Sequence, residues 1–533
     1  MEASTREPAR EETDVVVVGG GGAGLAAAIE AATLGRKVVL LEKNLRLGGS
    51  TAWSVGSITA TLTPHQIEAG VLDSPRDHDE DVPGFAGKWR GRDNDELRRV
   101  LTDNVPETFR WLLSMGLVFF GPMPEPPHRR PRMHNVLPNS RAYIYQLSAQ
   151  ARRLGVDIRL ESRVTSLVTS DGAVRGVKYE RPGRGASVVE ARGGVVLASG
   201  DYSASRELKA KFISPAVADV DPVNPLSTGD GQLMAMDLGA RVLNGDVSLG
   251  PEIRFVPPPV AGLLRALPPS RVLALIMKWG AKHLPDRLLR PFILSVLTTA
   301  LAPSRSLFTE GAILVNRKGK RFTDECAEPA VAVAAQPDKI AYILFDSWVA
   351  EKFSRWPHFI STAPGVAYAY LDDYRRNRKD IFHRAPTLEA LATRLGMEKS
   401  ALAETVTAYS ASDMNDRPKL QKAPFYVLGP VKGYVVITDG GLAIDRQMAV
   451  LDGSGKPIGG LFAAGSAGQG GLLLEGHGHH LGWAFTSGRI AGRSAACRAV
   501  TPPIVTGSTR EFPVVPRSPG TVERPAATSA LRN

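Results

Sequence analysis

The amino-terminal part of the chain alternates apolar runs with a glycine-rich turn, a pattern typical of a parallel α/β unit. Residues 14–18 form a β-branched run that predicts a buried strand. The glycine-rich stretch 19–24 follows at once, and the alanine-rich stretch 25–34 predicts a helix. A second apolar strand is predicted over residues 37–41 and finishes at Glu42. The pattern therefore predicts strand, glycine turn, helix and strand within about 30 residues.

Two further apolar strands are predicted far downstream. Residues 193–197 and 460–464 are each followed by a turn of small residues. Residues 481–499 then predict a helix that opens at Leu481 and Gly482. We expect these segments to join the amino-terminal unit, so that one cofactor domain is built from both ends of the chain.

The insert from residue 253 to 308 is both apolar and basic. One predicted helix has Arg271, Lys278 and Lys282 on one face, with Leu275, Ile276 and Trp279 opposite. A second apolar stripe lies within residues 288–297. Two interpretations remain open: a helix packed on the protein core, or a surface helix that touches a membrane or takes up an apolar substrate. Either interpretation favours a hydrophobic substrate over a small anion.

Composition narrows the class of protein. The chain has 533 residues, with 43% apolar and 22% charged, which is ordinary for a globular protein. Its two cysteines exclude a disulfide scaffold, a cysteine-rich zinc module and a four-cysteine iron–sulfur cluster. The charged start of the chain shows no secretory signal, and no apolar run is long enough to predict a membrane span, so we expect a cytoplasmic protein. The net charge of +11 suits an anionic partner. No nucleic-acid-binding motif occurs, however, so we do not expect the protein to bind nucleic acid.

Gly19, Gly21 and Gly24 satisfy the G-x-G-x-x-G pattern of a dinucleotide-binding turn. The first glycine allows the tight turn, the second lets the backbone approach a pyrophosphate, and the third lets helix pack on strand. Glu42 stands at the end of the second strand, where an acid accepts hydrogen bonds from the adenosine ribose. The alternative, a glycine-rich turn without a ligand, does not explain this acid.

The residues after Glu42 favour FAD over a nicotinamide cofactor. Gly48 and Gly49 are followed by Ser50 and Thr51, which suits a second pass along the pyrophosphate towards a flavin. Only one G-x-G-x-x-G follows a strand, so a second dinucleotide is not expected to bind.

Together these motifs resemble the FAD-dependent oxidoreductase 2 family, which includes fumarate reductase and succinate dehydrogenase flavoproteins and 3-ketosteroid dehydrogenases. The stretches 311–325 and 439–445 add to the likeness, which runs from about Thr13 to Ala496. The resemblance implies an α/β fold, with a Rossmann-like FAD-binding domain and an inserted α+β cap (catalytic) domain. The expected domains are FAD-binding over 13–250 and 425–500 and cap over 251–424, with disordered tails over 1–12 and 501–533.

The motifs and the resemblance together predict the FAD-binding residues. These are Gly19, Gly21, Gly22, Ala23, Gly24, Glu42, Lys43, Gly49, Ser50, Thr51, Val164, Gly200, Asp201, Gly465, Ser466, Leu481 and Gly482. Some relatives carry flavin covalently on a histidine in the segment at 48–49. Ser50 and Thr51 stand there instead, so we expect FAD to be non-covalent.

Three positions depart from the fumarate reductase pattern. The proton-donating arginine of those enzymes falls near Pro329, a substrate-binding histidine at Ile437 and a carboxylate-binding arginine near His480. A dicarboxylate substrate is therefore not expected. The catalytic tyrosines of the ketosteroid dehydrogenases are also absent at their expected places, so that resemblance concerns scaffold and chemistry only.

The segment 475–480 is the most unusual feature of the chain, because it holds three of the ten histidines. Histidine titrates near neutral pH and can donate to a carbonyl or move a proton. We predict His480 first and His477 second as catalytic residues, with a structural role against the flavin as an alternative. Adjacent histidines in a glycine-rich turn rarely chelate one metal, so no metal site is predicted.

Other candidate side chains carry a weaker signal. Tyr434 precedes an Asp-Gly-Gly turn and is a third catalytic candidate, whereas Asp439 is expected to bond the turn backbone. A packed helix face is expected for Tyr143 and Tyr145, with the cleft as the alternative. His134 and Arg141 are expected in a loop that approaches the substrate in this family.

We expect an FAD-dependent dehydrogenase or reductase acting on a CH–CH or C=C bond next to a carbonyl, on an apolar, alicyclic or steroid-like ketone. A second hypothesis is a fumarate-like unsaturated carboxylate, with Arg141 or the basic stretch 129–132 supplying charge. A third is a non-catalytic FAD- or lipid-binding protein at a membrane surface. A separate electron carrier is expected as partner, with peripheral membrane contact through 253–308 left open.

Overall fold

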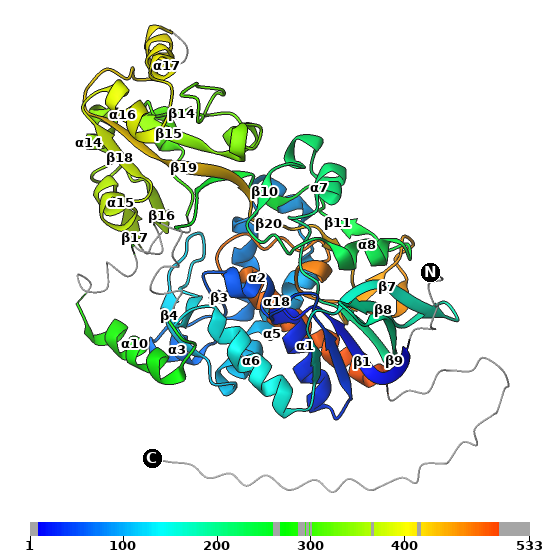
Figure 1. Cartoon of the computed structure of the whole chain (residues 1–533). Helices are drawn as coiled ribbons and strands as arrows, with labels where there is room; N and C mark the ends of the chain where they lie inside the picture. Colours follow the sequence, from blue (N-terminus) through cyan, green and yellow to red (C-terminus); the bar gives the residue numbers. More distant parts are fainter. Residues whose placement is uncertain are drawn as a thin grey trace, which may run out of the picture. The chain divides into compact units, whose positions relative to one another are not determined.

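The computed structural model of the chain describes residues 9–258, 267–285, 294, 298, 301–363, 367–412 and 417–499 (Figure 1). The stretches 1–8 and 501–533 that were expected as tails lie outside these residues, as does the predicted apolar stripe at 288–297 apart from Leu294. Among the described helices, none combines the length and apolar character needed to cross a bilayer.

A sheet of eight strands forms the centre of the cofactor domain. Its path β22-β23-β9-β1-β2-β6 brings together strands from both ends of the chain, as predicted, and every pair from β23 to β6 is parallel. The strands are β1 (Ala9–Val18), β2 (Val38–Leu41), β6 (Asp157–Arg159), β7 (Arg163–Ser170), β8 (Ala173–Arg181), β9 (Gly185–Leu197), β22 (Ala449–Leu451) and β23 (Pro457–Ala463). Buried β-branched side chains such as Val16 and Val195 fill the sheet, which suits a sheet covered on both faces.

Helix α1 (Gly22–Thr33) packs closely on helix α18 (His479–Arg498). Glycine makes this approach possible, because a Cβ at Gly488 would lie 2.3 Å from the carbonyl oxygen of Ala23 and one at Gly492 only 2.2 Å from that of Ala27. Arg489 ties the pair together by donating to Glu30 at 2.6 Å. Helix α18 is thereby held against the glycine turn that follows β1.

Smaller elements surround this core. The helices are α2 (Gly49–Trp53), α3 (Pro64–Glu68), α4 (Pro75–Asp81), α5 (Asp95–Ser114), α6 (Arg141–Arg153), α7 (Arg206–Phe212) and α8 (Asp230–Met236). The strands are β3 (Ser57–Thr59), β4 (Val118–Met123), β5 (Met133–Leu137), β11 (Val242–Leu243), β12 (Ser248–Leu249), β20 (Ile437–Thr438) and β21 (Gly441–Leu442). The sheet β3-β5-β4 and the strand β20 lead into the segments that carry the candidate catalytic groups.

A second sheet of six strands forms the cap. Its strands are β10 (Asp221–Pro222), β13 (Glu252–Phe255), β14 (Ile313–Val315), β15 (Ala341–Phe345), β18 (Phe382–Ala385) and β19 (Phe425–Val435). Its helices are α12 (Ser306–Thr309), α13 (Pro329–Ala334), α14 (Ser347–Lys352), α15 (Leu371–Asn377), α16 (Leu388–Leu395) and α17 (Lys399–Ala411), with a β16–β17 hairpin (Ser361–Ala363, Ala367–Ala369). The cap thus has the expected α+β character.

Two of the predicted boundaries need correction. The cap does not end at residue 424, because β19 pairs with β13, β15 and β18 and buries Leu428 and Val431 in the cap core. The predicted tail 1–12 is also too long, because β1 begins at Ala9. Residues 9–12 pair with Ser187–Glu190 of β9, so backbone hydrogen bonds order this polar stretch without burial.

Candidate active site

A cavity of about 850 Å³, partly open to solvent, lies at the carboxyl ends of β1, β2, β9 and β23. This is the edge at which open α/β sheets bind their ligands. Loops from distant parts of the sequence line it, including residues 18–23, 41–44, 49–51, 198–200 and 464–466, together with Ser162, Val164, Asn224, Leu226, Ser227, Asp230 and Ala484.

The glycine turn has the geometry that a pyrophosphate needs. Gly19 has a φ of +108°, and a Cβ on Gly24 would lie 1.9 Å from the carbonyl oxygen of Gly19, so both positions require glycine. A Cβ on Gly21 would meet nothing closer than 3.9 Å, which leaves open space above the backbone. Glu42 is buried and accepts the backbone N–H of Gly20 at 2.7 Å, which holds its carboxylate at the cavity wall.

A second group of polar side chains lies across the cavity. Asn224 donates to Ser50 at 2.9 Å and to Ser227 at 3.0 Å, and Thr51 accepts the backbone N–H of Gly22 at 3.2 Å. Lys43 pairs with Asp230 at 3.0 Å. The sequence did not point to Asn224, Ser227 or Asp230, because they lie in a loop and at the start of α8, where no motif occurs.

Four residues of the predicted FAD set do not line this cavity. Gly24 instead permits the helix to pack on the turn. Asp201 is buried and joins β9 to β20 by accepting from Ser203 and from the backbone of Thr438. In α18, Leu481 is packed in the core, and the N–H of Gly482 is already bonded to Gly478. The remaining thirteen predicted residues line the cavity.

These features fit FAD. The glycines leave room for a pyrophosphate, Glu42 would offer carboxylate oxygens to a ribose, and the positive end of the α1 dipole would favour the phosphates. In α18, Gly482 is the first residue whose N–H bonds to the cap residue Gly478. The N–H groups of His479, His480 and Leu481 precede it and have no acceptor within the helix. The positive end of this helix suits an anionic group.

His477 is held by a buried carboxylate from a distant loop. Its Nδ1–H donates to Oε1 of Glu125 at 2.5 Å, and its backbone N–H donates to the same oxygen at 2.7 Å. The hydrogen bond to Glu125 raises the pKa of His477, and burial opposes that effect. The imidazole is 42% exposed whereas the Glu125 side chain is 6% exposed, so Nε2 remains available to a substrate. Glu125 follows β4 and carried no signal in the sequence.

His480 is held in the same manner by Asp439. Its Nε2–H donates to Oδ1 of Asp439 at 2.9 Å, and Gln469 donates to the same oxygen at 2.8 Å. The Asp439 side chain is almost fully buried. The expectation that Asp439 bonds the turn backbone was therefore wrong for its carboxylate. Close by, burial raises the pKa of Glu475, and Asp439 adds to that effect.

Cap residues contribute charge to this region. Arg254 of β13 lies near enough to oppose protonation of His477, and it pairs with Glu252 at 2.5 Å. Tyr434 lies opposite Glu252 in the β13–β19 ladder. Burial raises the pKa of Tyr434, with Asp221 adding to the rise and Arg254 opposing it. Its charged neighbours are thus cap residues rather than the two histidines.

Four weaker candidates lie elsewhere. Tyr143 is fully buried and donates to the carbonyl oxygen of Gly56, while Tyr145 is exposed, which is the packed helix expected for α6. His134 is a buried residue of β5 rather than a loop residue, and its Nε2 lies 3.0 Å from Oγ1 of Thr63. Arg141 is exposed at the start of α6.

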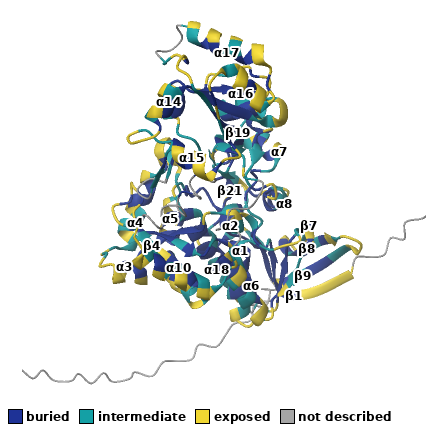
Figure 2. Cartoon of the chain, turned by 60° about the vertical axis from the view of Figure 1, so that its left-hand side comes forward, coloured by how far each residue is buried: buried dark blue, intermediate teal, exposed yellow. Residues whose placement is uncertain are grey.

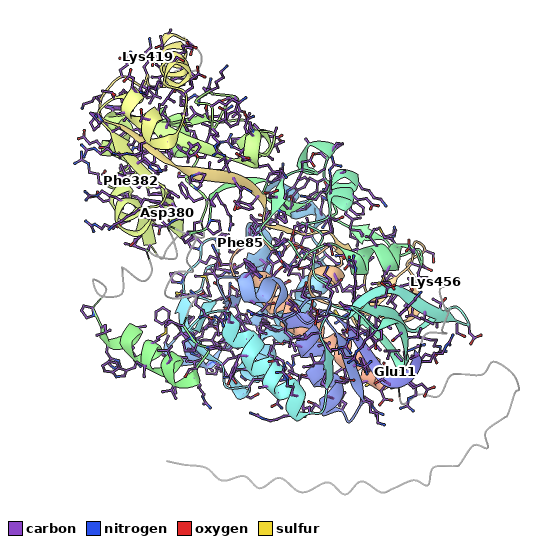
Figure 3. The ribbon with its side chains drawn as sticks, in the orientation of Figure 1. Glu11, Phe85, Asp380, Phe382, Lys419 and Lys456 are labelled. Carbon is purple, nitrogen blue, oxygen red and sulfur yellow. The ribbon has the colours of Figure 1, made fainter. Side chains whose placement is uncertain are left out.

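The third histidine of the segment, His479, belongs to a buried cluster with His78 and His128. Their ring nitrogens lie within 4.8 Å of one another, a spacing that a metal ion would allow. Phe85, labelled in Figure 3, packs against the cluster. Its ring centroid lies 4.7 Å from that of His128 and 5.2 Å from that of His479.

The donor set of this cluster does not fit a metal. Arg132 can only donate, so Nδ1 of His128 must accept its bond at 2.9 Å, which leaves the proton on Nε2. That proton is donated to Nε2 of His479 at 3.1 Å, and Nδ1 of His479 donates to the carbonyl oxygen of Glu475 at 2.6 Å. His128 therefore has no lone pair to offer a cation. The chain of bonds instead fixes the backbone at Glu475, next to His477.

The basic stretch 129–132 is also occupied by protein partners. Arg132 is fully buried and pairs with Asp73 at 2.7 Å and with Asp81. Arg129 pairs with the same Asp81 at 2.6 Å. A substrate carboxylate would have to displace these acids, so Arg129 and Arg132 do not supply the charge that a fumarate-like substrate needs.

Comparison with known proteins identifies the kind of protein that this site belongs to. A family described as "FAD binding domain" matches residues 14–264 and 291–473. A probable fumarate reductase of Shewanella frigidimarina is 29% identical over 521 residues, covering 92% of this chain and 76% of that protein. A flavocytochrome c3 fumarate reductase in its open conformation matches with a TM-score of 0.68 at 27% identity, over 92% of this chain and 79% of the other.

A steroid enzyme is a further structural neighbour. The 3-ketosteroid Δ4-(5α)-dehydrogenase of Rhodococcus jostii RHA1, in complex with 4-androstene-3,17-dione, matches with a TM-score of 0.57 at 25% identity. The match covers 93% of this chain and 99% of that enzyme. Both branches of the expected resemblance are therefore found, and the fumarate reductases match at higher identity.

Proposed function

Given that this chain belongs to the FAD binding domain family and is a flavoprotein oxidoreductase, we propose that it adds or removes hydrogen across a carbon–carbon bond next to a carbonyl group. The observation that carries this proposal is the pair of histidines, His477 and His480, each held by a buried carboxylate. When bound, FAD supplies hydride transfer at its ring system. The protein must then provide a proton-transfer group and a donor to the substrate carbonyl.

We assign proton transfer to His477. Glu125 fixes the ring with Nδ1 protonated, which directs Nε2 towards the exposed side. The same carboxylate raises the pKa of His477, so a larger fraction of the imidazole carries a proton near neutral pH. His480 has the complementary role of contacting the substrate carbonyl through Nδ1 when the ring carries a second proton, because Asp439 accepts the Nε2–H and sets the ring orientation. This order reverses the preference for His480 that the sequence alone suggested.

The substrate that the comparisons favour is an unsaturated carboxylic acid, because the fumarate reductases match at 27–29% identity. The residues argue against two carboxylates, since Pro329, Ile437 and His480 replace the groups that bind and protonate a dicarboxylate. Arg254 extends its charge to His477. We therefore propose an unsaturated acid with a single carboxylate, whose charge Arg254 balances while it stays paired with Glu252.

An apolar cyclic ketone is the second candidate substrate. The likeness to a ketosteroid dehydrogenase supports it, and so does a neutral carbonyl's compatibility with a histidine donor at position 480. The two candidates make opposite demands on Arg254, because only the acid needs its charge.

A recolouring experiment tests the proposal. The holoenzyme is reduced without oxygen until the flavin is bleached, and then receives fumarate, a monocarboxylic enoate or a cyclic enone. Recovery of colour with the enoate, lost in the variant Arg254→Met, supports the unsaturated acid. Recovery with the enone in both forms supports the ketone, and no recovery with any oxidant except a dye contradicts catalysis. Electrons are proposed to come from a separate carrier, so NADH alone should bleach the flavin slowly.

A further inference from the structure

Helix α10 (Arg271–His283) has its apolar side towards solvent. Val272, Leu275, Ile276 and Trp279 follow the i, i+3, i+4, i+7 spacing of one helix face, and they are between 49% and 68% exposed. His283 extends the same face, because its ring stacks on Trp279 with a centroid distance of 5.0 Å. Figure 2 colours residues of α10 as exposed.

The side of α10 that faces the protein carries the buried residues Ala274 and Gly280, and two lysines at its edge bond to α3. Lys278 lies 3.0 Å from Nε2 of His65, and Lys282 pairs with Glu68 of α3 at 3.1 Å. Ala274 is buried, and α10 contacts β4 and β5. Figure 1 shows α10 beside α3 and β4. A water-soluble surface helix normally has the opposite orientation, with its apolar stripe buried.

The charged residues beside this face indicate whether it binds a second copy of the chain or an anionic lipid surface. Arg271, Lys278 and Lys282 lie along one flank of the apolar stripe, α10 itself contains no acid, and Glu68 of α3 pairs with Lys282. In a symmetric dimer this face would meet its own copy, so like charges would oppose each other. An apolar stripe flanked by basic residues is instead the composition of a helix that lies in the headgroup region of an anionic bilayer.

We propose that α10 docks the protein on an anionic lipid surface. Trp279, Ile276, Leu275 and Val272 insert at the boundary between headgroups and acyl chains, and the exposed side chains of Arg271 and Lys282 beside them contact the lipid phosphates. This resolves the choice left open by the sequence in favour of the surface helix. The inference is independent of the substrate, because it uses no residue of the candidate active site.

The test is flotation of the full-length holoprotein with vesicles. Vesicles of phosphatidylglycerol and phosphatidylcholine should carry the protein, vesicles of phosphatidylcholine alone should carry much less, and added salt should release it. Trp279→Ser should weaken binding about tenfold, the amount expected for the loss of one large buried apolar side chain. Trp356→Ser is the matched control, because Trp356 is 62% exposed and Trp279 60%.

Three results would overturn the proposal. The first is failure of the wild type to float with anionic vesicles. The second is equal loss of binding in the Trp279→Ser and Trp356→Ser variants. The third is a concentration-dependent dimer in sedimentation velocity that Trp279→Ser dissociates, since the face would then be covered by a second copy. Retained flavin absorbance in both variants shows that the fold is intact.

Discussion

The Nδ1 atom of His477 lies 2.5 Å from Oε1 of Glu125, although the two residues are 352 positions apart in the chain. The bond joins the loop after β4 to the segment before α18. The hydrogen bond to Glu125 raises the pKa of His477. The same bond therefore sets both the position of the imidazole and its protonation state. The proposed proton transfer depends on this link.

Glu125→Gln should move the pH dependence of turnover. The carboxylate raises the pKa of His477, so its neutralisation lowers that pKa. If His477 donates the proton during reduction, activity is lost as the pH rises through its pKa, and the alkaline limb of kcat/KM should shift to lower pH in the variant. Glu80→Gln, a change at a carboxylate outside the site, is the control. An unshifted limb with normal FAD content would contradict the assignment.

His477→Ala and His480→Ala should each lower turnover without loss of FAD. General acid–base groups contribute on the order of a hundred- to ten-thousand-fold, so His477→Ala is expected in that range. His480→Ala should raise KM as well, because a donor to the substrate carbonyl is removed. Steady-state kinetics with flavin absorbance as the control measure both effects. Near-full turnover in both variants would redirect attention to Tyr434.

Acid should destabilise the protein progressively as the pH falls below about 6.5 towards about 3. Burial lowers the pKa of His128 to about 2 and that of His134 to about 3. The unfolded chain binds protons on these histidines below pH of about 6.5, whereas the folded chain does not, so stability falls as the pH falls. Melting temperature against pH measures this. His134→Asn should flatten the curve relative to the exposed control His283→Asn, and a curve that stays flat in the wild type would count against buried neutral histidines.

Metal chelators should leave the protein unchanged. The bond from Arg132 fixes the proton of His128 on Nε2, so the buried histidines are expected to exclude a divalent cation. EDTA dialysis should not alter the melting temperature or the flavin content, and added Zn²⁺ should not raise the melting temperature. Stoichiometric zinc in the purified protein, measured by elemental analysis, would show that the cluster does bind metal.

Acid precipitation should release the flavin into the supernatant. Ser50 and Thr51 occupy the segment in which some relatives carry a flavin-linking histidine, and Thr51 is engaged with the backbone of Gly22. A yellow pellet after precipitation with trichloroacetic acid would demonstrate a covalent bond and contradict the non-covalent assignment.

The sequence predicted the cofactor half of the molecule well because its constraints are local. Gly19, Gly24 and Glu42 lie within one strand–turn–helix–strand unit, and spacing alone fixes their roles. Glu125 could not be predicted, because its partner is contributed by the other end of the chain and no motif surrounds it. The boundary at 424 was misplaced for a similar reason, since only pairing with β13, β15 and β18 reveals that β19 belongs to the cap.

The histidine segment shows that the sequence alone does not distinguish neighbouring residues of the same type. His477, His479 and His480 are equivalent in the sequence, but their surroundings separate them. Glu125 and Asp439 hold the two partly exposed rings, whereas His479 is buried against His128. Periodicity also identified the apolar stripe of α10, but only the exposure of Val272, Ile276 and Trp279 reveals that the stripe is turned outward.

Flavin recolouring tests the central claim most directly. Holoenzyme bleached without oxygen is mixed with an unsaturated monocarboxylic acid or a cyclic enone, and oxidation of the flavin is followed by absorbance in the wild type and in His477→Ala. The proposed function predicts rapid recolouring of the wild type by one of the two, and recolouring at least about a hundredfold slower in the variant. Equal rates in both proteins, or no recolouring by either compound, would contradict it.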